Sequence, residues 1–149
     1  MTRREQRIFV FNELYFYGFY DKESFVRQCE LYLSSETEDP ALIEELKTRA
    51  ARVIENLTEI DDMINRTAIG WTTERMSKVD LSILRLAVFE AFFDEDIPES
   101  VAINEAVELA KKYSSGEAAS FINGILGKLS KNNNSGDSDG KNNIPGQPG

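Results

Sequence analysis

The sequence predicts an all-α fold of roughly seven helices, and three observations lead to this prediction. Apolar residues recur with the i, i+3, i+4 and i+7 spacing of amphipathic helices over most of residues 2–130. Residues typical of helix caps stand before several of these segments. No segment is convincing as a strand, and no repeat of about 20 to 50 residues indicates a solenoid.

The first two predicted helices follow each other closely. The first runs from Thr2 to about Tyr20, with Thr2 as its N-cap and Glu5 as the reciprocal partner of a capping box. Asp21 begins the next segment, whose apolar face includes Cys29. We therefore interpret Cys29 as a small core residue and not as a reactive thiol.

A long third helix is predicted to begin at Asp39-Pro40, because proline fits the first position of a helix. A short helix continues from it and ends at Gly70. The apolar face of this short helix is expected to hold Ile60, Ile64 and Ile69. Residues 71–76 are interpreted as a connector to the next segment.

Residues 78–96 are predicted to form a buried central helix. Apolar side chains surround this segment on nearly every side, which is typical of a helix enclosed by other helices. Two charged residues, Arg85 and Glu90, interrupt the apolar surface. Because an unpaired buried charge is costly, both side chains are expected to have partners.

Two more helices are predicted after the central one. Either Pro98 or Asn104 starts the first of them. Ser114 and Glu117 fit an S-x-x-E capping box at the start of the final helix. Gly124 lies inside this last helix, where glycine costs about 1 kcal/mol relative to alanine. We expect close approach of another helix to be the reason for it.

Composition excludes several classes of function. The 149 residues include no histidine and one cysteine, which excludes a Cys/His zinc site, an internal disulfide and histidine-dependent nucleophile pairs. No phosphate-binding glycine loop occurs, so neither an enzyme nor a cofactor or metal site is expected. Without a signal-peptide pattern or an apolar run of about 20 residues, the protein is expected in the cytoplasm. Residues 131–149 contain a single apolar residue and are expected to form a disordered low-complexity tail.

Charge is segregated along the chain. The net charge is −9, residues 36–62 carry −6 and residues 1–8 carry +2. An acidic protein is a poor candidate for coating nucleic acid, because phosphate repels it overall. A single small basic site on an acidic body is nevertheless compatible with this charge distribution. Arg3, Arg4 and Arg7 fall on the first two turns of a helix, where the dipole disfavours positive charge. They point either to an external anion or to solvated surface.

Phe121 is a second candidate contact for nucleic acid. It follows the capping loop before the final helix, from which its ring could stack on a base. The alternative is a core position, because Phe121 also heads the apolar stripe that continues with Ile125 and Leu129. Periodicity alone favours the core.

Several motifs resemble those of one family. The segment MSKVDLSILRLAVFE begins at Met76, PESVAINEAVELAK spans 98–111, and FINGIL begins at Phe121. The N-terminal R-R-x-x-R and the Leu14-Tyr15 that follows it complete the pattern. Together these motifs, over residues 2–130, resemble the NusB family of bacterial transcription antitermination factors.

The resemblance implies a fold and a function. The implied fold is two three-helix subdomains packed at about right angles, one over about 1–70 and the other over about 71–130. The implied function is RNA binding without catalysis. With NusE, a small-subunit ribosomal protein, such a protein binds the boxA element of nascent ribosomal RNA. The antitermination complex then helps RNA polymerase resist termination.

The resemblance also assigns residues. It implies RNA contacts for Arg3, Arg4, Arg7, Glu117 and Phe121. It implies contacts with NusE for Tyr15 and Asp80. The division of Tyr15, Asp80 and Glu117 between the two partners stays open. Glu5 departs from the basic run of many relatives, so weak affinity for bare RNA is expected. The alternative interpretation is a homodimeric protein-interaction scaffold with weak or no RNA binding.

Overall fold

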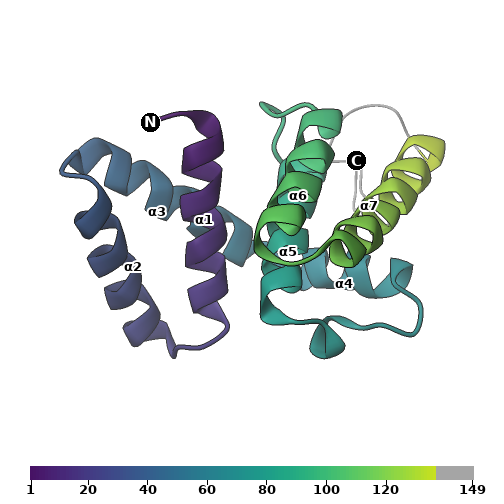
Figure 1. Cartoon of the computed structure of the whole chain (residues 1–149), viewed down its shortest axis with the longest axis horizontal. Coiled ribbons are helices and arrows are strands. Elements are labelled where there is room, and N and C mark those ends of the chain that lie inside the picture. Colours follow the sequence, from purple (N-terminus) through teal and green to yellow (C-terminus); the bar gives the residue numbers. More distant parts are fainter. Residues whose placement is uncertain (137–149) are drawn as a thin grey trace. The chain divides into compact units, whose positions relative to one another are not determined.

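The structure, a computed structural model, describes residues 1–136. Within this range it contains seven α-helices, one short 3-10 helix and no strand, which confirms the all-α prediction (Figure 1). The elements are α1 (Arg3–Tyr17), α2 (Lys22–Glu36), α3 (Pro40–Glu55), α4 (Leu57–Thr67), the 3-10 helix η1 (Thr73–Arg75), α5 (Lys78–Phe92), α6 (Glu99–Tyr113) and α7 (Gly116–Gly136).

The chain divides into two compact units. The first is Met1–Asn56 and holds α1 to α3, and the second begins at Leu57 and holds α4 to α7. The resemblance implies a boundary near residue 70, whereas the compact units divide after Asn56 and α4 belongs to the second. The reason is that α4 packs against α5 and α7.

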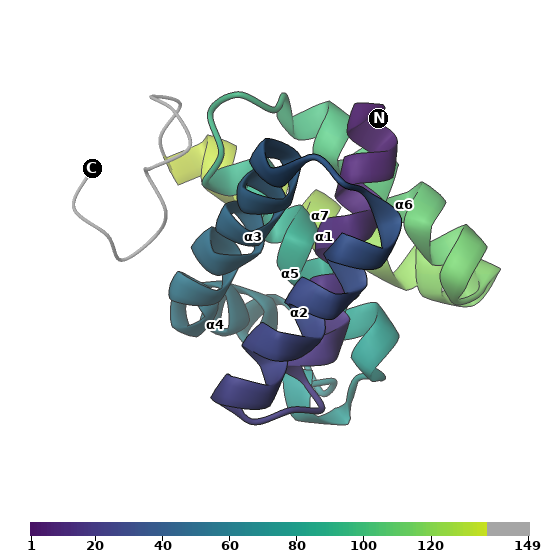
Figure 2. The same ribbon diagram turned by 90° about the vertical axis from the view of Figure 1, so that its left-hand side faces the viewer.

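In the first unit, α1, α2 and α3 pack pairwise around a small apolar core (Figures 1 and 2). Cys29 is buried in this unit, and burial raises the pKa of its thiol to about 12, with the nearby Glu13 adding to the rise. The thiol is therefore protonated at neutral pH, and the prediction of a core cysteine is confirmed. The other fully buried apolar side chains of the unit are Val10, Phe11, Leu14, Leu33, Leu46, Ala50 and Val53.

Three predicted helix starts are confirmed in the first unit. The Thr2 hydroxyl and the Glu5 carboxylate form a reciprocal capping box at the start of α1. The Asp21 carboxylate accepts a hydrogen bond from the Ser24 N–H at 2.8 Å and caps α2. Asp39 caps α3. These side chains satisfy backbone donors that a helix N-terminus leaves unpaired.

In the second unit, α5 is the central helix. It packs against α4, α6 and α7, and ten of its fifteen residues are buried. The predicted buried helix is therefore confirmed, although it ends at Phe92 and not at residue 96. Of the two helix starts left open after it, Pro98 is the N-cap of α6.

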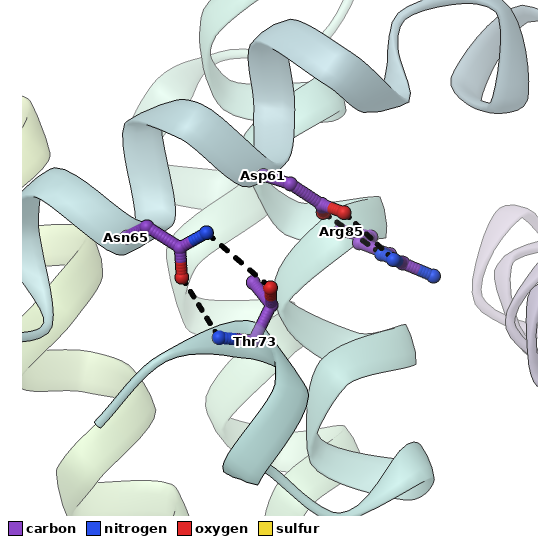
Figure 3. Close-up of polar contacts among 4 residues, drawn as sticks. All are labelled: Asp61, Asn65, Thr73 and Arg85. Atoms are coloured by element: carbon purple, nitrogen blue, oxygen red, sulfur yellow. Dashed lines mark hydrogen bonds and ion pairs between the residues drawn. The ribbon is translucent and has the colours of Figure 1, made fainter.

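Polar contacts join α4 to the segments that follow it (Figure 3). Arg85 on α5 forms an ion pair with Asp61 on α4. The Asn65 side chain on α4 accepts a hydrogen bond from the Thr73 N–H at 2.8 Å and donates one to its hydroxyl at 3.3 Å. The expectation that Arg85 has a partner is thus confirmed. The Asn65–Thr73 hydrogen bonds attach the connector to α4, and the Asp61–Arg85 ion pair attaches α4 to the central helix.

The structure corrects three details of the sequence interpretation. Ile69 is 90% exposed, because α4 ends at Thr67 and the chain turns at Gly70, whose φ of 79° lies in the left-handed region. Ser115 caps α7, since its hydroxyl accepts from the Ala118 N–H, while Ser114 is the C-cap of α6. A Cβ at Gly124 would meet no atom of residues 1–136 within 4 Å, so close approach of another described helix is not the reason for this glycine.

The last helix continues further than composition indicated. Residues 131–136, expected to begin the tail, belong to α7. Asn133 is buried and lines a cavity of about 290 Å³ with Met63 and Thr67 of α4, which explains the longer helix. The rest of the expected disordered tail, residues 137–149, lies outside the described residues.

Candidate nucleic-acid interface

The three candidate arginines share the first two turns of α1 but differ in exposure. Arg3 and Arg4 are exposed. Arg7 is only 7% exposed, so its side chain is part of the protein interior. Two guanidinium groups therefore lie at the surface of this helix start, and a third is held in the packing.

The capping box fixes the backbone on which these arginines stand. The Thr2 N–H donates to the Glu5 carboxylate and the Glu5 N–H donates to the Thr2 hydroxyl, each at 3.1 Å. These hydrogen bonds with Thr2 lower the pKa of Glu5, which is ionised at neutral pH. Glu5 therefore stabilises the helix start while placing a negative charge among the arginines.

Tyr15 lies near the C-terminal end of α1. Its ring is half-buried and packs against Phe19, with ring centroids 4.9 Å apart. Phe19 is itself exposed, as are Tyr17 and Tyr20. This end of α1 thus presents aromatic side chains to the surface, a composition enriched where proteins meet partners.

Asp80 lies in the first turn of α5, where the helix dipole favours a negative charge. The Ser77 hydroxyl caps this helix by accepting from the Asp80 N–H at 3.1 Å. The Oδ1 atom of Asp80 is buried and has no hydrogen-bond partner among residues 1–136. Such an atom is an acceptor that a donor from a partner would satisfy.

Glu117 and Phe121 lie on one stripe of α7. The i, i+4, i+7, i+11 spacing brings Gly124 and Lys128 onto the same stripe. Phe121 is half-buried, unlike its fully buried neighbour Ile122, so part of the ring is accessible. Because no atom of the described part of the chain lies within 4 Å of a Cβ at Gly124, this part leaves the helix surface beside the ring open.

A shallow groove lies beside this stripe. Its volume is about 480 Å³ and its walls come from α6 and α7. Hydroxyl, amide and ammonium groups face it together with small and aliphatic side chains. The lining residues are Ser100, Ile103, Asn104, Val107, Lys111, Gly116, Ala119, Ser120 and Asn123.

Sequence reasoning missed this groove, Lys128, and an exposed pair at the connector. Trp71 is exposed, and the Arg75 guanidinium lies 5.1 Å from its ring centroid. The groove carries no local signal, because its polar groups come from two helices. Lys128 could have been found by extending the helical spacing from Phe121.

The candidate residues form two groups. Arg3, Arg4, Arg7 and Tyr15 belong to the first unit, while Asp80, Glu117 and Phe121 belong to the second. Among residues 1–136, no three metal-ligating side chains cluster. In the same range, no helix has both the length and the apolar character needed to cross a bilayer.

Comparison of the sequence with known proteins gives a consistent match. Residues 4–131 match the NusB family. A transcription antitermination protein NusB from Agathobacter rectalis is 45% identical over 131 residues, which is 87% of this chain and 99% of that protein. The protein of that name from Acetivibrio thermocellus is 60% identical over 79 residues, 53% of this chain and 54% of the relative.

Solved structures of NusB proteins also match this chain. A structure of T. maritima NusB matches with a TM-score of 0.75 and 36% identity, covering 88% of this chain and 92% of that chain. A structure of antitermination factors NusB and NusE in complex with dsRNA matches with a TM-score of 0.72 and 24% identity. That match covers 89% of this chain and 99% of the other, and it shows the fold.

Proposed function

The chain belongs to the NusB family, and from this premise we propose that it is an RNA-binding transcription antitermination factor acting in the cytoplasm. Its RNA is the boxA element of nascent ribosomal RNA, which it binds together with NusE in the antitermination complex of RNA polymerase. The observation that carries the proposal is the pair of exposed arginines on the capped first turn of α1, within a chain that matches the family along almost its whole length.

The arginine turn supplies phosphate contacts. Arg3 and Arg4 are exposed, and their guanidinium groups can bind phosphate oxygens. Arg7 has to leave its buried position before it can join them. Because Glu5 offsets part of this positive charge and the chain carries −9, the arginines alone give weak binding.

The stripe on α7 supplies base contacts. The accessible part of Phe121 offers a stacking face, and the open surface at Gly124 leaves room for a base beside it. Lys128 offers a further phosphate contact on the same stripe, and Glu117 accepts hydrogen bonds from base or sugar donors. The groove between α6 and α7 adds hydroxyl and amide groups able to reach base edges.

NusE is the proposed protein partner of Tyr15 and Asp80. The unpartnered Oδ1 of Asp80 suits a cationic donor, and an acidic residue facing a basic ribosomal protein is electrostatically complementary. The Tyr15–Phe19 aromatic pair offers apolar contact area. A basic partner would also extend the RNA path beyond the two exposed arginines.

Salt-dependent RNA binding tests the proposal. The double variant Arg3→Ala/Arg4→Ala should weaken boxA binding by the complex with NusE and flatten the salt slope by about 1.4, or about 0.7 per phosphate contact. Phe121→Ala should weaken binding with little change in slope, because stacking releases no counterions. The control Arg49→Ala/Arg66→Ala removes the same charge from α3 and α4 and should leave the slope unchanged.

The contrary result is equally clear. If the Arg3/Arg4 variant binds boxA as the unchanged protein does, with the same salt slope, the arginine turn is ordinary solvated surface. The homodimeric scaffold would then be the better interpretation, and light scattering would show whether the protein is a dimer.

A further inference from the structure

The first unit contains a cavity of about 830 Å³ that the proposed function does not use. It lies among α1, α2 and α3, and all of its lining residues belong to this unit. Its volume falls in the range of small-molecule sites, about 300 to 1,000 Å³. The walls are largely apolar, with Tyr17 and Phe25 packed edge to face at 5.4 Å between ring centroids.

A buried acid lines this cavity. Glu13 is 1% exposed, and its Oε2 atom is buried without a hydrogen-bond partner. Burial raises the pKa of this carboxyl to about 8, although a hydrogen bond with the Cys29 thiol and the charge of Lys47 oppose the rise. A buried carboxyl oxygen that lacks a donor is costly, and a ligand that supplies the donor removes the cost.

Among residues 1–136, no group donates a hydrogen bond to this oxygen. Lys47, the cation that acts on Glu13, directs its Nζ to Glu30 at 2.9 Å and to Glu44 at 3.5 Å. The charged side chains around the cavity are three glutamates and two lysines: Glu13, Glu44, Glu55, Lys22 and Lys47. With Glu13 ionised this set carries an excess of one negative charge, which disfavours an anionic ligand and favours a cationic one. Because the pKa of Glu13 is raised to about 8, an ammonium group that binds near neutral pH displaces the Glu13 proton.

We propose that this cavity binds a small amine with an apolar aromatic body, whose ammonium group donates to Glu13. The aromatic body fits the walls formed by Tyr17, Phe25 and the aliphatic Ile54. The ammonium supplies both the missing donor and the compensating charge. The site lies within the first unit and does not depend on RNA binding, so each proposal can fail without the other.

Three probes that share a ring and differ in head group test the site: tryptamine, its neutral alcohol tryptophol, and indole-3-acetate. Titrated into the ¹⁵N-labelled full chain at a pH of about 8.5, where the Glu13 carboxyl with its pKa of about 8 is largely ionised, tryptamine should shift amide resonances of α1 to α3 with a Kd of about 1 mM or tighter. Tryptophol should bind more weakly, and the anionic indole-3-acetate should not bind. Resonances of α5 to α7 should stay in place.

Variants then locate the contact. Glu13→Gln should lower tryptamine affinity about tenfold and leave tryptophol affinity within about twofold, because the lost attraction concerns the charge alone. Glu45→Gln, an equal charge change on an α3 residue that does not line the cavity, should change neither. Val26→Trp at the exposed rim should block all probes without disturbing the core.

Three results overturn the proposal. One is the absence of shifts in α1 to α3 with tryptamine at about ten times the expected Kd. Another is equal binding of tryptamine by the unchanged protein and by the folded Glu13→Gln variant. The third is displacement of these same resonances by NusE while tryptamine leaves them unmoved, which would make the cavity a protein-docking surface.

Discussion

Arg85 on α5 and Asp61 on α4 form a two-pronged ion pair, with Nε 2.9 Å from Oδ1 and Nη2 2.7 Å from Oδ2 (Figure 3). Both side chains are largely withdrawn from solvent, at 16% and 25% exposure. The planar guanidinium matches the carboxylate in this geometry, which a lysine could not reproduce. The pair fixes how α4 lies on the central helix.

Arg85→Met is expected to destabilise the protein by about 1 to 3 kcal/mol, because it leaves the Asp61 charge partly buried without its partner. Urea unfolding followed by circular dichroism measures this free energy. The matched control is Arg66→Met, which removes an exposed arginine 3.7 Å from Asp62 and should cost less than about 0.5 kcal/mol. Equal losses in the two variants would show that the Arg85 pair is worth no more than a surface contact.

Local signals explain why the helices could be predicted. Thr2, Asp21 and Asp39 each satisfy backbone donors within three residues, so their effect is visible in the sequence. The central helix could be predicted as well, because apolar residues on nearly every side leave it only a small solvent face.

The structural features that could not be predicted depend on residues distant in sequence or on where a helix ends. Asp61 is 24 positions from Arg85, and no local sequence pattern identifies it as the partner of this arginine. Glu13 sits on a helix of ordinary composition, and only packing of α2 and α3 against α1 reveals its burial. Ile69 fitted the helical period but lies beyond the end of α4, where periodicity no longer determines the face.

Leu84→Ala is expected to cost about 2 to 5 kcal/mol of unfolding free energy, because Leu84 is fully buried on α5. Ile69→Ala removes a branched aliphatic side chain from a site that is 90% exposed, and it should cost less than about 0.5 kcal/mol. Chemical denaturation of both variants gives the comparison. A loss below about 1 kcal/mol for Leu84→Ala would contradict the core placement of this residue.

Glu5→Gln is expected to strengthen RNA binding without weakening the fold. Glutamine can keep the reciprocal hydrogen bond with Thr2, while the negative charge beside Arg3 and Arg4 disappears. The expected gain in boxA affinity is a few-fold at low salt, and it should shrink as salt rises, since it is electrostatic. Fluorescence anisotropy at two salt concentrations measures it. Glu23→Gln, a change of the same charge in the first turn of α2, serves as the control and should leave boxA affinity unchanged. An unchanged affinity in Glu5→Gln would show that RNA does not approach the first turn of α1.

Glu13 makes stability depend on pH in a defined window. The pKa of its carboxyl is 4.5 in an unperturbed chain and about 8 in the folded protein, where burial disfavours the charge. Between these values the folded state holds a proton that the unfolded state has lost. The contribution of the Glu13 carboxyl to the free energy of unfolding is therefore complete below pH 4.5, falls as the pH rises toward 8, and then levels off.

Glu13→Gln should remove this dependence, because glutamine stays neutral and keeps a similar shape. Relative to the unchanged protein, the variant should gain little free energy of unfolding at pH 4.5 and on the order of 4 kcal/mol near pH 7.5. Neither neighbour interferes in this window, since the pKa of Cys29 is raised to about 12 and that of Lys47 is raised above its ordinary value by Glu30. Unfolding free energies measured every half unit from pH 4.5 to 8.5 decide the matter. A stability difference between the two proteins that stays constant across that range would show that the Glu13 carboxyl titrates normally and is not buried as described.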